Sequence, residues 1–242
     1  MMKTIFQSFS DVSLIDIFLK IGLVGYVILM ILLGFSIVSW AIIFYKYRKL
    51  RQIQKESQKF LELYQENSDL GEVYAASVAL RIAPVVRVFK AGYLELQRIR
   101  KEMMTINVER KVSMEVIFPD WIEDLASVLQ ETIVRETALL EHLLIFLAIT
   151  TSSAPLLGLL GTVWGIMASF WSVGMQGYTS LNVIAPGVSA ALVTTIAGLL
   201  TAIPAAIAYN MLLNRIKSLS SEIECFASGF TNVVRRELRK VL

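Results

Sequence analysis

Two reactive residue types are almost missing from this sequence, and one long stretch has no ionisable residue. Cys225 is the only cysteine among 242 residues, so no disulfide can form within the chain. His142 is the only histidine, which excludes a histidine-rich zinc site, and we interpret it as an interfacial polar residue. The chain also lacks a Gly-x-Ser-x-Gly elbow, a P-loop and a dinucleotide fingerprint. These absences argue against an enzyme, a cofactor or a bound metal.

No Asp, Glu, Lys, Arg or His occurs between Leu143 and Asn214. As one helix this stretch would be roughly 105 Å long at ~1.5 Å per residue, whereas a bilayer core is ~30 Å thick. The chain must therefore fold back, and Gly and small polar residues in 174–182 predict the turn. We expect two transmembrane helices, over residues 143–173 and 183–213.

A third apolar run, residues 21–45, has spanning length and ends in aromatic residues. Basic residues follow from Lys46 to Lys59, so by the positive-inside bias this side is cytoplasmic. The N-terminus is then outside and the C-terminus inside. The predicted fold is an all-α integral membrane protein with three transmembrane helices. The second and third are long and extend into a helical cytoplasmic domain.

The remaining segments are assigned around the spans. Residues 1–20 are amphipathic near their end, which favours a segment lying in the interface with membrane lipid. Residues 46–142 are expected to form a helical cytoplasmic domain, punctuated at Pro84 and Gly92. Pro119 predicts the start of a helix that runs without a break into the second span. Residues 214–242 are compatible with a C-terminal helix. The net charge of +3 is too small to suggest nucleic acid.

Small residues recur through the two charge-free spans. Gly158, Gly161 and Gly165 lie three and four residues apart, which predicts close packing against another helix. Three prolines also fall in these spans, where neighbouring helices can satisfy the backbone groups that they free. They are Pro155, Pro186 and Pro204.

Thr162 and Thr195 are the sharper candidates for function. A membrane threonine usually bonds to a carbonyl of its own helix, and the alternative is a hydroxyl in a polar pathway. A chain that conducts protons normally keeps an ionisable residue in the membrane, and these spans have none. Either the protein conducts nothing, or another subunit supplies the titrating group. Residue counting leaves both open.

Two segments resemble the TolQ/ExbB/MotA proton-channel family. They are Gly158-Leu-Leu-Gly-Thr-Val-Trp-Gly-Ile-Met167 and residues 183–210, which include Ala-Pro-Gly and Thr194-Thr195. The beginning of the chain, at 14–20 and 31–43, is most similar to the TolQ branch. The similarity covers all three spans in order and is weak over 46–120.

This resemblance implies a homo-pentameric ring around two helices of a TolR-like (ExbD-like) dimer. Each of those helices carries an Asp that takes up and releases protons, so the missing ionisable residue belongs to the partner. Thr162 and Thr195 would face that Asp from a pore lined by the second and third spans. A TolA-like (TonB-like) coupling protein would connect this inner-membrane motor, driven by the proton-motive force, to the cell envelope during division.

One position departs from the family pattern. Many members carry a Glu three residues after Ala-Pro-Gly, where this chain has Ala190. The departure argues against a proton relay at that position and puts weight on its neighbours, Ser189, Thr194 and Thr195. Two other functions stay open: an ExbB-type subunit that energises TonB-dependent uptake, and a passive membrane scaffold ring.

Overall fold

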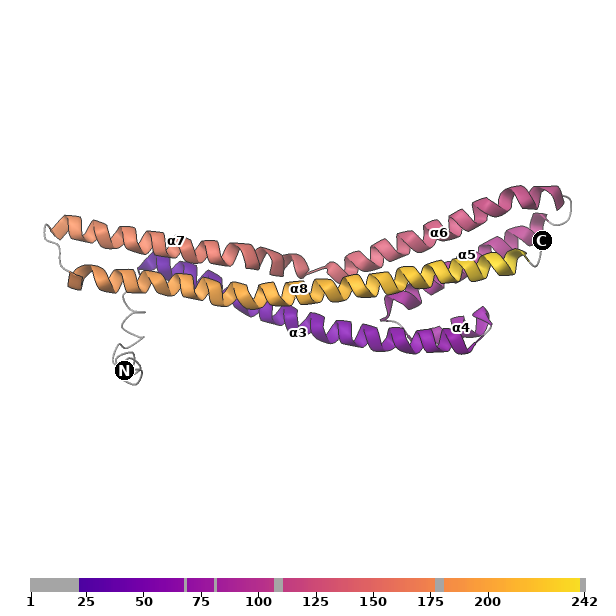
Figure 1. The fold of residues 1–242 in the computed structure, drawn as a ribbon, viewed down its shortest axis with the longest axis horizontal. Coiled ribbons are helices and arrows are strands. Elements are labelled where there is room, and N and C mark those ends of the chain that lie inside the picture. Colours follow the sequence, from indigo (N-terminus) through magenta and orange to yellow (C-terminus); the bar gives the residue numbers. More distant parts are fainter. Residues whose placement is uncertain (1–21, 68, 81, 107–110, 177–180, 240–242) are drawn as a thin grey trace. The chain divides into compact units, whose positions relative to one another are not determined.

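The computed structural model describes residues 22–67, 69–80, 82–106, 111–176 and 181–239, and all regular structure in these residues is helical. The helices are α3 (Leu23–Glu66), α4 (Leu70–Ser77), α5 (Pro84–Ile106), α6 (Lys111–Glu141), α7 (Leu144–Gln176) and α8 (Leu181–Arg239) (Figure 1). The predicted all-α fold is confirmed. The predicted interfacial segment 1–20, the loop residues 177–180 and the last three residues of the tail lie outside the described residues.

Three of these helices, α3, α7 and α8, are long and apolar enough to cross a membrane. The charge-free residues occupy the start of α3, the whole of α7 and the first part of α8, so no charged group has to enter hydrocarbon. α8 continues from Leu181 to Arg239, so the third span and the C-terminal tail are one helix. The chain is an integral membrane protein with three spans, as predicted.

The helices group into two compact units. The described residues of the membrane unit fall within Met1–Phe44 and Leu143–Met211, and those of the extramembrane unit fall within Tyr45–His142 and Leu212–Leu242. α3 and α8 therefore each contribute one part to the membrane unit and another part to the extramembrane unit.

The core of the membrane unit is small. Ile28 and Leu32 of α3 are buried together with Ala154 of α7 and Ala202 of α8. Large apolar side chains stay exposed on all three helices, and Trp171 is 75% exposed. A surface of this kind suits lipid or other membrane helices rather than water.

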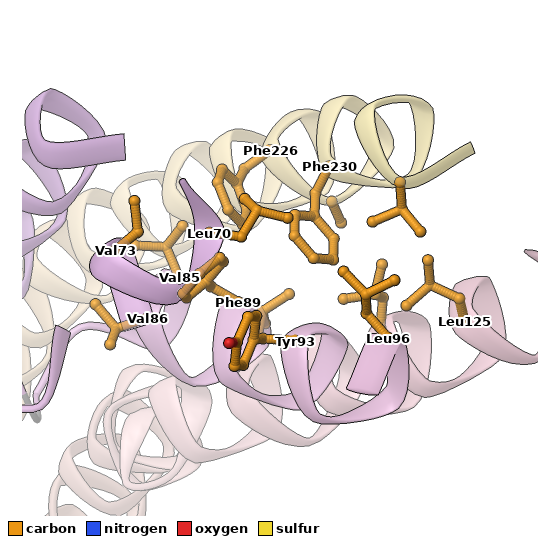
Figure 2. Packing of buried hydrophobic residues seen from close by; sticks show 14 of the residues in the cluster. Leu70, Val73, Val85, Val86, Phe89, Tyr93, Leu96, Leu125, Phe226 and Phe230 are labelled. Carbon is orange, nitrogen blue, oxygen red and sulfur yellow. The ribbon is translucent and has the colours of Figure 1, made fainter. Parts of the chain in front are cut away.

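The extramembrane unit has a larger core, with aromatic rings at its centre. The Phe60 ring lies 5.3 Å from the Phe89 ring and 5.7 Å from the Phe226 ring, measured between centroids. Phe89 of α5 also meets Phe230 of α8 edge to face at 5.6 Å (Figure 2). Burying each such ring contributes about 1.5–3 kcal/mol, so this unit is held together by its own apolar contacts.

Gly92 lies inside α5, so the predicted break there is wrong, whereas Pro84 does begin a helix. A Cβ on Gly92 would lie 2.7 Å from Cε1 of Phe230 and 2.8 Å from Cδ2 of Leu129. Gly92 therefore permits the close approach of α5 to α6 and α8.

The predicted helix start at Pro119 is also wrong, because α6 begins at Lys111 and contains the proline. Proline removes one backbone hydrogen bond from a helix interior. The next turns nevertheless bury Trp121 and Leu125 in the core of the extramembrane unit. This packing stabilises the helix after the proline.

The expected continuous helix into the second span is interrupted. α6 ends at Glu141 and α7 begins at Leu144, and between them Leu143 has a φ of 74°, which is costly for a non-glycine residue. Lys46 Nζ donates to the Leu140 carbonyl oxygen at 2.6 Å and so satisfies one carbonyl at the end of α6. Neither Gly nor Pro marks this break in the sequence.

Candidate functional site

α7 and the first part of α8 run antiparallel (Figure 1). They lie so close together that several glycines in their contact have no room for a Cβ. A Cβ on Gly158 would lie 2.9 Å from the Thr194 carbonyl oxygen, and one on Gly165 would lie 2.6 Å from the Ala191 Cβ. From the other side, a Cβ on Gly198 would lie 2.6 Å from a carbonyl oxygen of α7. Backbones meet here as they do in small-residue contacts between membrane helices. We call this contact the α7–α8 seam.

Three threonines lie in the middle of the α7–α8 seam. Thr162 of α7 is 8% exposed and Thr194 of α8 is 1% exposed. Thr195 Oγ1 donates to the Gly158 carbonyl oxygen at 3.0 Å and lies 3.4 Å from Thr162 Oγ1. Gly161 leaves the space that the Thr194 hydroxyl occupies, since a Cβ on Gly161 would overlap it. We call these three residues the threonine cluster.

Each hydroxyl of the threonine cluster has one proton, and backbone carbonyls take all three. Thr162 Oγ1 donates to the Leu159 carbonyl oxygen at 2.7 Å, and Thr194 Oγ1 donates to the Ala191 carbonyl oxygen at 2.7 Å. Thr162 thus makes the same-helix bond expected of a membrane threonine, whereas Thr195 bonds across the seam. Each oxygen keeps lone pairs that can accept. The cluster therefore suits a group that brings a proton, such as water or a protonated carboxyl.

The other predicted site residues lie outside the threonine cluster. Ser189 has an exposed side chain on α8. Ala190 is 3% exposed and lines a cavity next to the cluster. The predicted prolines all lie inside helices that continue past them: Pro155 in α7, and Pro186 and Pro204 in α8.

A second polar contact in the membrane unit was missed by the sequence analysis. Ser39 Oγ of α3 donates to Thr150 Oγ1 of α7 at 3.4 Å, and Thr150 Oγ1 donates to the Phe146 carbonyl oxygen at 2.9 Å. Ser39 and Thr150 are both buried. The only signal in the sequence was a serine within an apolar span, and its partner is 111 residues away. The contact joins the first span to the second.

The threonine cluster has no titrating chemistry of its own. Neither α7 nor the membrane part of α8 contains Asp, Glu, Lys, Arg or His, the residues that usually take up and release protons in a membrane pathway. In the part of the chain that the structure describes, no three His, Cys, Asp or Glu side chains gather where they could hold a metal ion. What the cluster can do is accept hydrogen bonds and orient a donor that another molecule supplies.

The fold and the site together define a class, a three-span helical membrane protein with an uncharged seam that carries hydroxyl groups. The family described as the MotA/TolQ/ExbB proton channel family matches residues 82–225, and the chain belongs to that family. The matched region contains the whole threonine cluster.

Relatives from two branches of the family align over most of their length. The Tol-Pal system protein TolQ of Haemophilus influenzae is 31% identical over 230 residues, which cover 94% of this chain and 96% of that protein. TolQ of Pseudomonas aeruginosa is 33% identical over 220 residues, or 90% of each chain. The biopolymer transport protein ExbB of Neisseria meningitidis is 27% identical over 205 residues, covering 85% of this chain and 88% of that protein. The two TolQ proteins are therefore more similar to this chain than the Neisseria ExbB is, and they cover more of it.

Proposed function

We propose that this protein is the TolQ-type subunit of a Tol-Pal-type motor in the bacterial inner membrane, and that it guides protons without titrating itself. The observation that carries the proposal is the threonine cluster, in which buried and partly buried hydroxyls meet between two spans that have no Asp, Glu, Lys, Arg or His. The similarity to two TolQ proteins over at least 90% of the chain supports the Tol-Pal role.

In this proposal five copies form a ring around the two helices of a TolR-like dimer, each helix carrying an Asp. The protonated Asp donates its single proton to a lone pair of Thr162 or Thr195. The ionised Asp needs donors instead, and Thr195 can supply one by turning its proton away from the Gly158 carbonyl. The two protonation states therefore prefer different hydrogen-bond partners on the ring wall.

The available energy is sufficient for such a step. One charge that crosses 100 mV releases ~2.3 kcal/mol, whereas a hydrogen bond between membrane helices contributes ~0.6–2 kcal/mol. A few protons per stroke can therefore break and remake the contacts that hold the partner helices in one position. A TolA-like protein would pass this motion to the envelope during division.

The proposal also keeps the predicted orientation, with the N-terminus in the periplasm and the C-terminus in the cytoplasm. Basic residues from Lys46 to Lys59 follow the first span, and Arg215 and Lys217 follow the third. The loop between the second and third spans has no charged residue. A reporter enzyme that is active only in the periplasm, fused after Gln176, tests this arrangement.

The direct test is proton flux into liposomes that contain this protein together with its Asp-bearing partner. We expect flux with the partner present and none when the partner's Asp is replaced by Asn. Robust flux from this protein alone would contradict the proposal, because the titrating group would then have to be its own.

Two other functions are separated by different observations. An ExbB-type subunit is favoured by the similarity to ExbB, and a TonB-like rather than a TolA-like coupling protein encoded beside this gene would support it. A passive scaffold ring is favoured by the uncharged spans, and the absence of flux in the complete complex would support it.

A further inference from the structure

We propose that a water-filled passage inside each subunit leads from the end of α7 to the threonine cluster, an inference that rests on the proposed function because the passage serves protons. A cavity of about 260 Å³ lies in the membrane unit beside the cluster. Its walls are Gly22 and Gly25 at the start of α3, residues of α7 between 161 and 172, and residues of α8 between 187 and 194. All of these walls belong to one unit of one chain.

The cavity has the length that a passage requires. Gly161 and Ser172 both line it, and eleven residues of helix between them correspond to roughly 16 Å. That is about half of a ~30 Å bilayer core. Ser172 lies four residues before the end of α7 at Gln176. The cavity therefore extends from the level of the threonine cluster toward the connection between α7 and α8.

The buried hydroxyls in the walls favour water as the occupant. Ser169 is 8% exposed and its Oγ donates to the Gly165 carbonyl oxygen at 2.8 Å, while Thr194 donates to the Ala191 carbonyl oxygen. Both oxygens keep lone pairs, which water can satisfy and a lipid chain cannot. Dry cavities are apolar, and at about 30 Å³ per molecule this cavity has room for several waters.

Residue 190 forms part of the wall of the passage. Ala190 lines the cavity and is 3% exposed, so a longer side chain at this position would project into the space now left open. The short side chain leaves room for water, and water rather than a side chain then carries the proton past this point. The passage ends at hydroxyls that accept hydrogen bonds.

The test is the reaction of an introduced thiol in the full chain, expressed with its partner in native membranes. Cys225 is exposed and is first replaced by Ser. Ala190→Cys is compared with Ala202→Cys, which has the same original residue on the same helix and similar burial, 3% against 5%. Ala202 packs in the apolar core with Ile28 and Leu32. The probe is a trimethylammonium-ethyl methanethiosulfonate, whose permanent charge admits it to water but not to a dry core.

We expect the thiol at position 190 to react at least about tenfold faster than the thiol at position 202. Equal rates at the two positions would overturn the passage. If Ala190→Cys does not reach the membrane, Ser169→Cys is compared with Ala202→Cys by the same criterion, because Ser169 also lines the cavity and is 8% exposed against 5%. Labelling does not depend on proton flux, so a negative result removes the passage and leaves the proposed function standing. Loss of the proposed function would leave the labelling result unchanged.

Discussion

Replacing Thr195 by valine removes one hydroxyl from the α7–α8 seam and leaves the shape of the side chain nearly unchanged. The substitution deletes the bond to the Gly158 carbonyl oxygen at 3.0 Å and the contact with Thr162 Oγ1 at 3.4 Å. Thr194 Oγ1 still reaches the Gly158 carbonyl at 3.2 Å. Hydrogen bonds between membrane helices average about 0.6 kcal/mol and reach about 1.7 kcal/mol. The loss is small beside a typical free energy of unfolding of about 5–15 kcal/mol, so we expect assembly to survive.

The effect on proton transfer should be larger than the effect on assembly. A hydrogen bond to a charged group contributes about 1.5–3 kcal/mol, and each 1.4 kcal/mol corresponds to about a tenfold change in rate. If Thr195 supports the proton-carrying group of the partner, its loss lowers proton flux by roughly 10-fold to 100-fold. At that rate, proton-driven work in the cell should be lost. Thr162→Val should act in the same way, and Thr195→Ser should restore function because it returns the hydroxyl.

Thr201→Val is the matched control. Thr201 lies on the same helix as Thr195, is 8% exposed like Thr162, and donates to the Ala197 carbonyl oxygen of its own helix at 2.9 Å. Its hydroxyl bonds within α8 rather than across the seam, so we expect normal flux. The assays are complementation of a strain that lacks the gene, complex recovery on purification, and flux in liposomes. Full complementation by both Thr162→Val and Thr195→Val would refute the hydroxyl role, as would an equal defect in Thr201→Val.

Three further predictions concern packing and pH. Gly161→Ala places a methyl group on the Thr194 hydroxyl and should lower the free energy of unfolding by about 1–3 kcal/mol in thermal unfolding. Gly174 has open space around it, so Gly174→Ala should leave the free energy of unfolding unchanged. Lys46→Met leaves the Leu140 carbonyl at the end of α6 without its donor, which should lower the free energy of unfolding by about 1–3 kcal/mol in the same measurement. An unchanged Tm would show that this contact does not stabilise the interruption between α6 and α7. Burial raises the pKa of Tyr64 in the extramembrane unit above 10.0. As pH rises, the unfolded chain loses this proton before the folded protein does. The free energy of unfolding should therefore fall as pH rises through 10.0 toward the raised pKa. Tyr64→Phe should reduce this pH dependence in unfolding curves measured across the same range.

Much of the membrane architecture could be read directly from residue order. The charge-free stretch from Leu143 to Asn214 is too long for one crossing, and its middle contains turn residues, so two spans follow from the cost of burying charge. The helical spacing of Gly158, Gly161 and Gly165 indicated a packing face. These inferences depend only on local composition, which can be read from a single sequence without knowledge of the tertiary structure.

Predictions that depended on single proline or glycine residues were less successful. Pro119 and Gly92 both lie inside helices, because contacts with other helices outweigh the local preference of either residue. The break at Leu143 has no local signal, and Lys46, which supports it, is 94 residues from its acceptor. Such contacts cannot be inferred from neighbouring residues.

By itself the sequence determined that this protein crosses the membrane three times with helices, and that its last two spans contain hydroxyls but no Asp, Glu, Lys, Arg or His. Only the tertiary structure decided which hydroxyls meet, joining Thr162 to Thr195 while leaving Ser189 exposed, and only it formed the cavity beside Ala190. The physical reason is register. Where two antiparallel helices touch backbone to backbone, glycines set how far one slides along the other, and that sliding selects the side chains that face each other.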